Sequence, residues 1–178
     1  MKEKDITFED KLWKAADKLR KKVEVHEYKY VVLGLIFLRY LSFAFEEKKK
    51  EILQKEAEDY PDEFKLKICE DRDLYLANGT LYIPEQATWD YIKKNASQPN
   101  IGEIIDKAIE ILENEHPRQL KDVIPKIYTR INLDHLDIAY LINLFSSIQF
   151  GLAHRGKDIF GRIYEYFLGK FTEAEGKK

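Results

Sequence analysis

The sequence has little of what stabilises secreted or membrane proteins. Among its 178 residues there is one cysteine, Cys69, so no internal disulfide can form, as is typical of a reducing cytoplasm. The first ten residues lack the hydrophobic region of a secretion signal. The most apolar run, residues 31–45, contains Arg39 and is too short to span a bilayer. We interpret it as a buried core helix of a cytoplasmic protein.

Recognisable cofactor and catalytic motifs are also missing. The chain has no G-x-G-x-x-G and no P-loop, so no phosphate-binding loop is visible. Its four histidines are scattered without the spacing of metal ligands, which predicts that no metal is bound. No residue stands in a pattern typical of a nucleophile or an acid–base pair. We therefore expect neither a catalytic residue nor a bound cofactor in this chain.

An excess of charge of one sign is absent too. The 30 basic and 32 acidic residues leave a net charge of −2. A domain that binds DNA by itself is usually basic, because phosphate neutralisation drives such binding. The composition argues against autonomous DNA binding but leaves room for a few phosphate contacts inside a larger assembly. Three basic residues near expected turns are candidates for DNA binding, namely Lys126, Arg130 and Arg155.

What the sequence does contain is helical periodicity. A chain of this length forms one domain that buries roughly 70% of its unfolded surface, and apolar residues recur at helical spacing along most of it. We predict a mainly α fold, a compact helical domain. In the closing stretch, Asp158 is expected to cap the last helix. Gly161 and Gly169, in the interior of that helix, either permit close packing of a neighbour or are merely tolerated.

Further local predictions concern turns, caps and helix faces. Asn78-Gly79 lies between two apolar segments and favours a two-residue hairpin turn, which predicts one small β-hairpin near residues 74–83. Side-chain caps are expected at Thr7, Asn100 and Asp134, each at the start of a helical pattern. In the helix that follows Asp134, Leu136 and Tyr140 are expected to face inward.

Three separated segments resemble one family. Residues 28–47 contain Leu-Gly-Leu-Ile-Phe-Leu-Arg-Tyr, and residues 81–89 read Leu-Tyr-Ile-Pro-Glu-x-Ala-x-Trp. Residues 158–178 contain Asp-x-x-Gly-x-x-Tyr-Glu-Tyr-x-Leu-x-x-Phe, followed by Ala-Glu-Gly-Lys-Lys. In this order they resemble the N-terminal helical domain of the modification (M) subunits of type I restriction–modification systems. Those subunits are adenine-N6 DNA methyltransferases.

The resemblance implies a division of the chain and a set of partners. Residues 1–157 would be the N-terminal helical domain, and 158–178 the start of the connecting helix and linker to a methyltransferase domain. The full-length enzyme would use S-adenosylmethionine to methylate an adenine that has left the duplex. Its partners would be a specificity subunit, a second modification subunit and a restriction subunit, with DNA enclosed by the complex. The resemblance also implies a role in closing that complex around DNA.

The Asn/Asp-Pro-Pro-aromatic motif, with which such methyltransferases hold the target amino group, is absent from these residues. This fragment alone is therefore expected to be inactive and to bind no S-adenosylmethionine. Two other interpretations stay open. One is a stand-alone helical protein-interaction module. The other is a defence ribonuclease that uses His135 for proton transfer and Arg130 to hold the phosphate.

Overall fold

The computed structural model describes residues 7–21, 23–55, 57–151 and 153–176. Within these ranges the chain is helical and contains no strand. The elements, in chain order, are α1 (Phe8–Asp17), α2 (Val25–Lys55), α3 (Asp62–Ile68), α4 (Arg72–Leu76), the short 3-10 helix η1 (Glu85–Ala87), α5 (Trp89–Lys94), α6 (Ile101–Glu115), α7 (Pro117–Leu120), α8 (His135–Ser146) and α9 (Ala153–Gly176). The predicted mainly α fold is confirmed.

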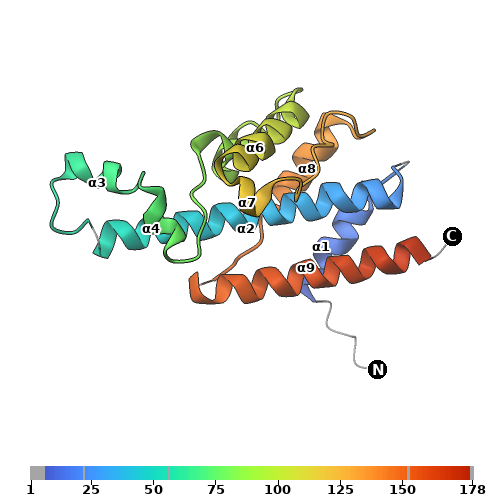
Figure 1. Ribbon diagram of the computed structural model, residues 1–178. Coiled ribbons are helices and arrows are strands. Elements are labelled where there is room, and N and C mark those ends of the chain that lie inside the picture. Colours follow the sequence, from blue (N-terminus) through green and yellow to red (C-terminus); the bar gives the residue numbers. More distant parts are fainter. Residues whose placement is uncertain (1–6, 22, 56, 152, 177–178) are drawn as a thin grey trace.

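Helix α2 is the axis of the molecule. It runs the length of the fold, with α9 beside it in the opposite direction and α6 and α8 across its other side (Figure 1). By length and composition α2 could cross a membrane, but more than half of its apolar stretch is buried by the surrounding helices. Burial on most sides accounts for its nearly continuous apolar sequence. The interpretation of residues 31–45 as a core helix is therefore confirmed.

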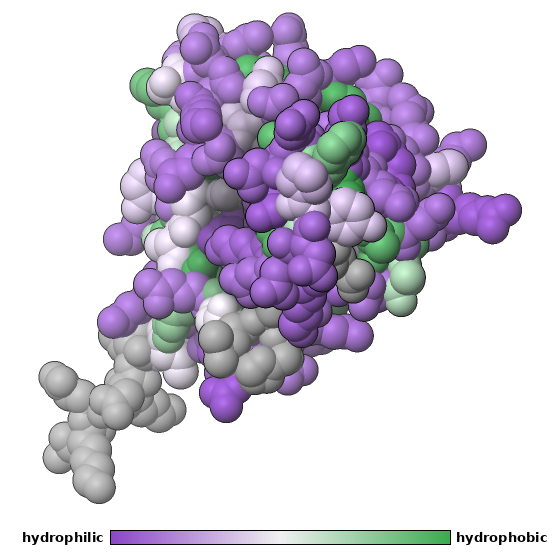
Figure 2. Space-filling view, turned by 90° about the vertical axis from the view of Figure 1, so that its left-hand side faces the viewer, coloured by the Kyte–Doolittle hydropathy of each residue, from purple (hydrophilic) through white to green (hydrophobic). Residues whose placement is uncertain are grey.

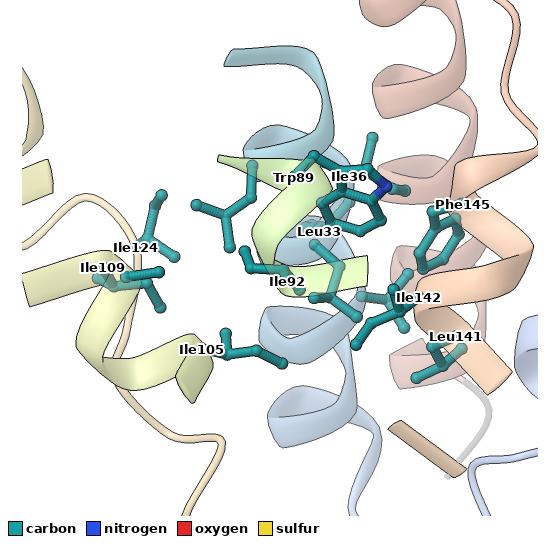
Figure 3. Close-up of a cluster of buried hydrophobic side chains, with 14 of the residues drawn as sticks. Leu33, Ile36, Trp89, Ile92, Ile105, Ile109, Ile124, Leu141, Ile142 and Phe145 are labelled. Atoms are coloured by element: carbon teal, nitrogen blue, oxygen red, sulfur yellow. The ribbon is translucent and has the colours of Figure 1, made fainter. Parts of the chain in front are cut away.

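Two packed layers hold α2 in place. On one side, Ile163, Phe167 and Phe171 of α9 are fully buried, and the Trp13 ring meets the Phe171 ring edge-on at 4.8 Å. On the other side, a cluster of aliphatic and aromatic side chains joins α2 to α5, α6 and α8 (Figure 3). Large buried aliphatic and aromatic side chains contribute about 1.5–3 kcal/mol each, so both layers stabilise the position of α2.

The predicted β-hairpin near residues 74–83 is wrong. The segment instead contains α4, which ends in a Schellman motif: Thr80 N donates to Tyr75 O at 3.0 Å, and Gly79 N donates to Leu76 O at 3.0 Å. Gly79 has φ +71°, whereas Asn78 is not among the residues with positive φ. A type I′ hairpin turn needs positive φ at both positions. An Asn-Gly pair can end a helix as well as form a hairpin turn, because its glycine supplies the single left-handed residue that a helix end needs.

Other local predictions have mixed outcomes. The side chains of Thr7 and Asp134 cap α1 and α8 as expected, but that of Asn100 makes no capping hydrogen bond. Helix α9 begins at Ala153, so the expected cap at Asp158 is wrong. A helical start before Asp158 makes residues 153–157 part of the same rigid element.

Helix faces and glycines also differ from expectation in part. In α8, Leu136 and Tyr140 are 63% and 51% exposed, so their predicted inward orientation is wrong. A Cβ built at Gly161 or Gly169 would meet nothing within 4 Å, so these glycines are tolerated within this fold. Close approach occurs instead at Gly102, where a Cβ would lie 2.4 Å from Tyr128 O.

Candidate nucleic-acid interface

The loop after α7 carries two of the three candidate DNA contacts. Asp106 of α6 fixes this loop, since its carboxylate accepts from Tyr128 N and Thr129 N, each at 3.1 Å, and from Thr129 Oγ1 at 2.8 Å. The buried Tyr128 hydroxyl donates to Val31 O of α2 at 2.7 Å, and burial raises its pKa. The loop is therefore attached to both α2 and α6 and presents Lys126 and Arg130 from a rigid base.

Lys126 has an internal partner. Its Nζ lies 3.1 Å from Glu113 Oε1, and the hydrogen bond to that carboxylate holds the pKa of Lys126 above its usual value. The ammonium stays charged, but the adjacent carboxylate cancels most of its field at a distance. A phosphate at this position would have to compete with Glu113, so Lys126 is a weaker candidate than its exposure suggests.

Arg130 is the stronger candidate. It is exposed in the turn before α8 and forms no ion pair with any residue that the structure describes. It lines a surface hollow of about 410 Å³ together with His26, Glu27, Tyr30 and Pro125. Guanidinium groups bind phosphate oxygens in a bidentate manner, which positions nucleic acid without reading sequence. The arrangement suits a contact with the phosphate backbone.

Arg155 lies elsewhere. The next residue, Gly156, packs against Phe43, whereas the Pro125 loop packs against Gly34 through Ile124. Nine residues of α2 separate these two points, which is about 13 Å along a helix. The structure therefore does not bring Arg155 into one cluster with Lys126 and Arg130. Arg155 is exposed in the first turns of α9.

Sequence reasoning missed an apolar groove beside the same loop. It has a volume of about 450 Å³ and lies between α2, α9 and residues 123–125. Its lining includes the exposed Tyr30 and Val123 and the aromatic rings of Phe37, Phe160 and Tyr164. Tyr30 also lines the hollow beside Arg130, so the two depressions are neighbours. The signal in the sequence was Tyr30, an aromatic residue directly before the apolar run 31–45 that was interpreted as core.

The ribonuclease interpretation finds no support in this geometry. Arg130 belongs to a turn, and His135 is the first residue of α8. The His135 Nδ1 lies 3.1 Å from Asp134 Oδ1, and the hollow that Arg130 lines does not include His135. Within the described ranges, no group of three His, Cys, Asp or Glu side chains could hold a metal ion. The described residues therefore do not bring Arg130 and His135 together in this hollow, although His26 and Glu27 line it beside Arg130.

Comparison with known proteins places the chain. The family described as the HsdM N-terminal domain matches residues 8–145. The chain is 61% identical over 176 residues to the type I restriction enzyme MjaIX methylase subunit of Methanocaldococcus jannaschii, a match that covers 96% of this chain and 32% of the relative. It is 38% identical over 87 residues to the type I restriction enzyme HindI methylase subunit of Haemophilus influenzae, covering 44% of this chain and 19% of the relative.

The chain thus spans about a third of the length of the first of these relatives. The family match extends from α1 through most of α8 and includes the loop with Lys126 and Arg130. Because this match covers far more than half of the residues, the chain belongs to the HsdM N-terminal domain family.

Proposed function

We propose that this chain acts as the N-terminal domain of a larger subunit that methylates adenine N6 in DNA with S-adenosylmethionine. The observation that carries the proposal is the family match over residues 8–145, together with a 61% identical relative whose printed name is a methylase subunit. The methyl-transfer site would belong to a part of that subunit outside these 178 residues. Residues 1–157 would form the domain body, and 158–178 would carry the chain toward the methyltransferase domain.

The proposed partners are a specificity subunit, a second modification subunit and a restriction subunit, in the cytoplasm. Both relatives are named as parts of type I restriction enzymes, which supports a multi-subunit setting. Within it the domain would help to close the assembly around DNA. The net charge of −2 fits a domain that meets DNA through few contacts and depends on its partners for affinity.

For DNA contact we propose Arg130 first, then Arg155 and Lys126. Arg130 is exposed without an ion pair in the described part of the chain, whereas Lys126 is held by Glu113. Arg155 would touch phosphates at a separate point near the start of α9. None of the three would read bases, because phosphate contacts fix position and carry no sequence information.

The test compares Arg130→Ala with Arg118→Ala in the assembled complex. Arg118 is an exposed arginine on α7 and serves as the matched control. Loss of one phosphate contact weakens binding on all DNA sequences and lowers the salt slope of log Kobs by about 1. We expect this for Arg130→Ala and no change for Arg118→Ala. Equal slopes for the wild type and both variants would remove Arg130 from the interface.

A protein-interaction role is the second candidate. It is favoured by the exposed apolar side chains of α3, among them Phe64 and Leu66. DNA contact and protein interaction can be separated by experiment. A variant that loses partner binding without any change in the salt slope of DNA binding would support a role in protein interaction alone.

A further inference from the structure

Exposed apolar side chains are concentrated at one end of the molecule. Nine large hydrophobic side chains are exposed among the described residues, and four of them lie within residues 60–76. These four are Tyr60, Phe64, Leu66 and Leu76, of which Leu66 is 64% exposed. We call residues 57–76, which contain α3 and α4, the acidic lobe. Figure 1 shows α3 standing apart from the other helices at the far end of α2.

The acidic lobe is firmly attached although its outer helix is exposed. Tyr75 is fully buried, its hydroxyl donates to Cys69 O at 2.6 Å, and its ring lies 5.1 Å from that of Phe45 in α2. Arg72 forms an ion pair with Glu115 at the end of α6. Helix α3, in contrast, has no buried residue. The lobe therefore presents α3 from a fixed base, as expected of a preformed docking surface.

A groove runs along this surface between α3 and the start of α4. It has a volume of about 470 Å³ and is lined by Tyr60, Phe64, Lys67, Ile68, Asp71 and Leu74. Phe64 and Ile68 are one helical turn apart and share a face, whereas Leu66 lies on the opposite side of α3. Figure 2 looks onto this end of the molecule and shows hydrophobic residues exposed among hydrophilic ones. Clustered exposed apolar groups rimmed by charge are typical of interaction sites.

Charge decides what can cover this surface. Residues 57–76 contain seven acidic and three basic side chains, a net charge of −4. Two of the three basic residues are already paired, Lys65 with Asp62 and Arg72 with Glu115. A negative surface repels nucleic acid and anionic lipid, and it repels its own copy in a symmetric dimer, where the same patch faces itself. A basic protein surface remains as the complementary occupant.

We propose that the acidic lobe docks a different protein subunit, through a surface that places an apolar side chain among lysines and arginines. The apolar part of that partner surface would cover Leu66 and extend to the groove, and its basic rim would face residues such as Glu63 and Asp59. The proposal rests on the proposed function, because it takes the partner from among the other subunits of the same complex. It assigns protein contact to the lobe and leaves DNA contact to the Arg130 loop.

The experiment uses the full-length methylase subunit assembled with its cognate specificity and restriction subunits. Leu66→Glu places a charge where an apolar contact is proposed, and Glu63→Lys reverses a charge on the rim. Leu136→Glu on α8 is the matched control, since Leu136 is 63% exposed against 64% for Leu66. We expect Leu66→Glu to weaken association of one subunit by about tenfold or more. Glu63→Lys should weaken it at low salt, and Leu136→Glu should leave it unchanged.

Hydrogen exchange on the same samples locates the contact. Amides of residues 60–76 should exchange more slowly in the assembled complex than in the lone methylase subunit, beyond the protection that the hydrogen bonds of α3 and α4 already give. Exchange in residues 60–76 that does not slow when the subunits assemble would mean that no other subunit covers the lobe, which overturns the proposal. Equal assembly of the wild type and all variants also overturns it, without touching the proposed function. A wild-type subunit that assembles with no partner refutes the proposed function, and the lobe proposal with it.

Discussion

Ser42 shows how a single polar residue joins two elements inside the core. It lies on α2, it is 3% exposed, and its Oγ accepts from Trp89 N, the first amide of α5, at 2.8 Å. The first amides of a helix have no partner within the helix, so this hydroxyl from α2 acts as a cap on α5. The hydroxyl is therefore needed both for hydrogen bonding and for the position of α5.

We predict that Ser42→Ala destabilises the fold by about 1–3 kcal/mol, because it leaves a buried amide without an acceptor. The control is Ser97→Ala, at an exposed serine in the turn after α5. Urea unfolding followed by circular dichroism measures both variants. Equal unfolding free energies for the two variants would show that water or another group replaces the Ser42 hydroxyl.

Asp10 and Tyr166 form the second residue-scale link, between α1 and α9. The Tyr166 hydroxyl donates to Asp10 Oδ1 at 2.8 Å, and Lys14 Nζ lies 3.1 Å from Asp10 Oδ2. The hydrogen bond from Tyr166, and then Lys14, holds the pKa of Asp10 below its ordinary value of 3.8. A carboxyl group whose pKa is lower in the folded state contributes to the unfolding free energy at pH values above its unfolded-state pKa. This contribution is lost as the pH falls through the folded-state pKa.

Tyr166→Phe should therefore make the unfolding free energy less sensitive to acid. We expect the wild type to lose more stability than the variant between pH 6 and pH values below about 4. Urea titrations at several pH values give both curves. Parallel curves over that range would mean that the Tyr166 hydroxyl does not act on the Asp10 pKa.

At the scale of elements, the glycines of α9 and α6 make opposite predictions. Gly161 and Gly169 have open space where a Cβ would stand, so alanine at either position should stabilise α9 by about 1 kcal/mol through helix propensity. At Gly102 of α6 the Cβ would collide with the backbone of Tyr128, so Gly102→Ala should destabilise by roughly 1–3 kcal/mol. Thermal unfolding of the three single variants tests the sign. A destabilising change at Gly161 or Gly169 would contradict this packing of α9.

Two of the four helix caps expected from sequence form in the structure, and the helix faces were predicted less well. Thr7 and Asp134 cap helices through side-chain bonds to amides two or three residues away, so the local pattern contained the whole interaction. Helix α8 has apolar residues on several faces, and the pattern wrongly placed Leu136 inward, whereas the fold exposes Leu136 and buries Leu141. The Asn78-Gly79 pair likewise fits a hairpin turn or a helix end. Tertiary packing settled both cases.

The candidate DNA contacts show the same limit. Lys126 and Arg130 were equivalent in the sequence, but the fold places Glu113 beside Lys126 alone. Glu113 is thirteen residues away and belongs to α6, so no local pattern links the pair. The acidic lobe was not recognised from sequence either. Its apolar residues became informative only when the fold left them exposed at one end of α2.

At the scale of the whole molecule, the fold separates surfaces of different character. The Arg130 loop lies against the middle of the helical body, held by α2 and α6. The acidic lobe projects at the far end of α2, where its charge disfavours DNA. In a complex that encloses DNA, this separation would let one domain contact DNA with one surface and another subunit with a second. The isolated domain should bind DNA weakly, since its net charge is −2.

The most direct test of this account measures N6-methyladenine formation in target DNA by three samples. These are the full-length methylase subunit in its complex, the same complex with residues 1–178 deleted, and the isolated 178-residue chain. We predict methylation by the first sample, no methylation by the third, and a loss of about tenfold or more in the second, with S-adenosylmethionine binding retained. Methyl transfer by the isolated chain, or full activity after the deletion, would contradict the account.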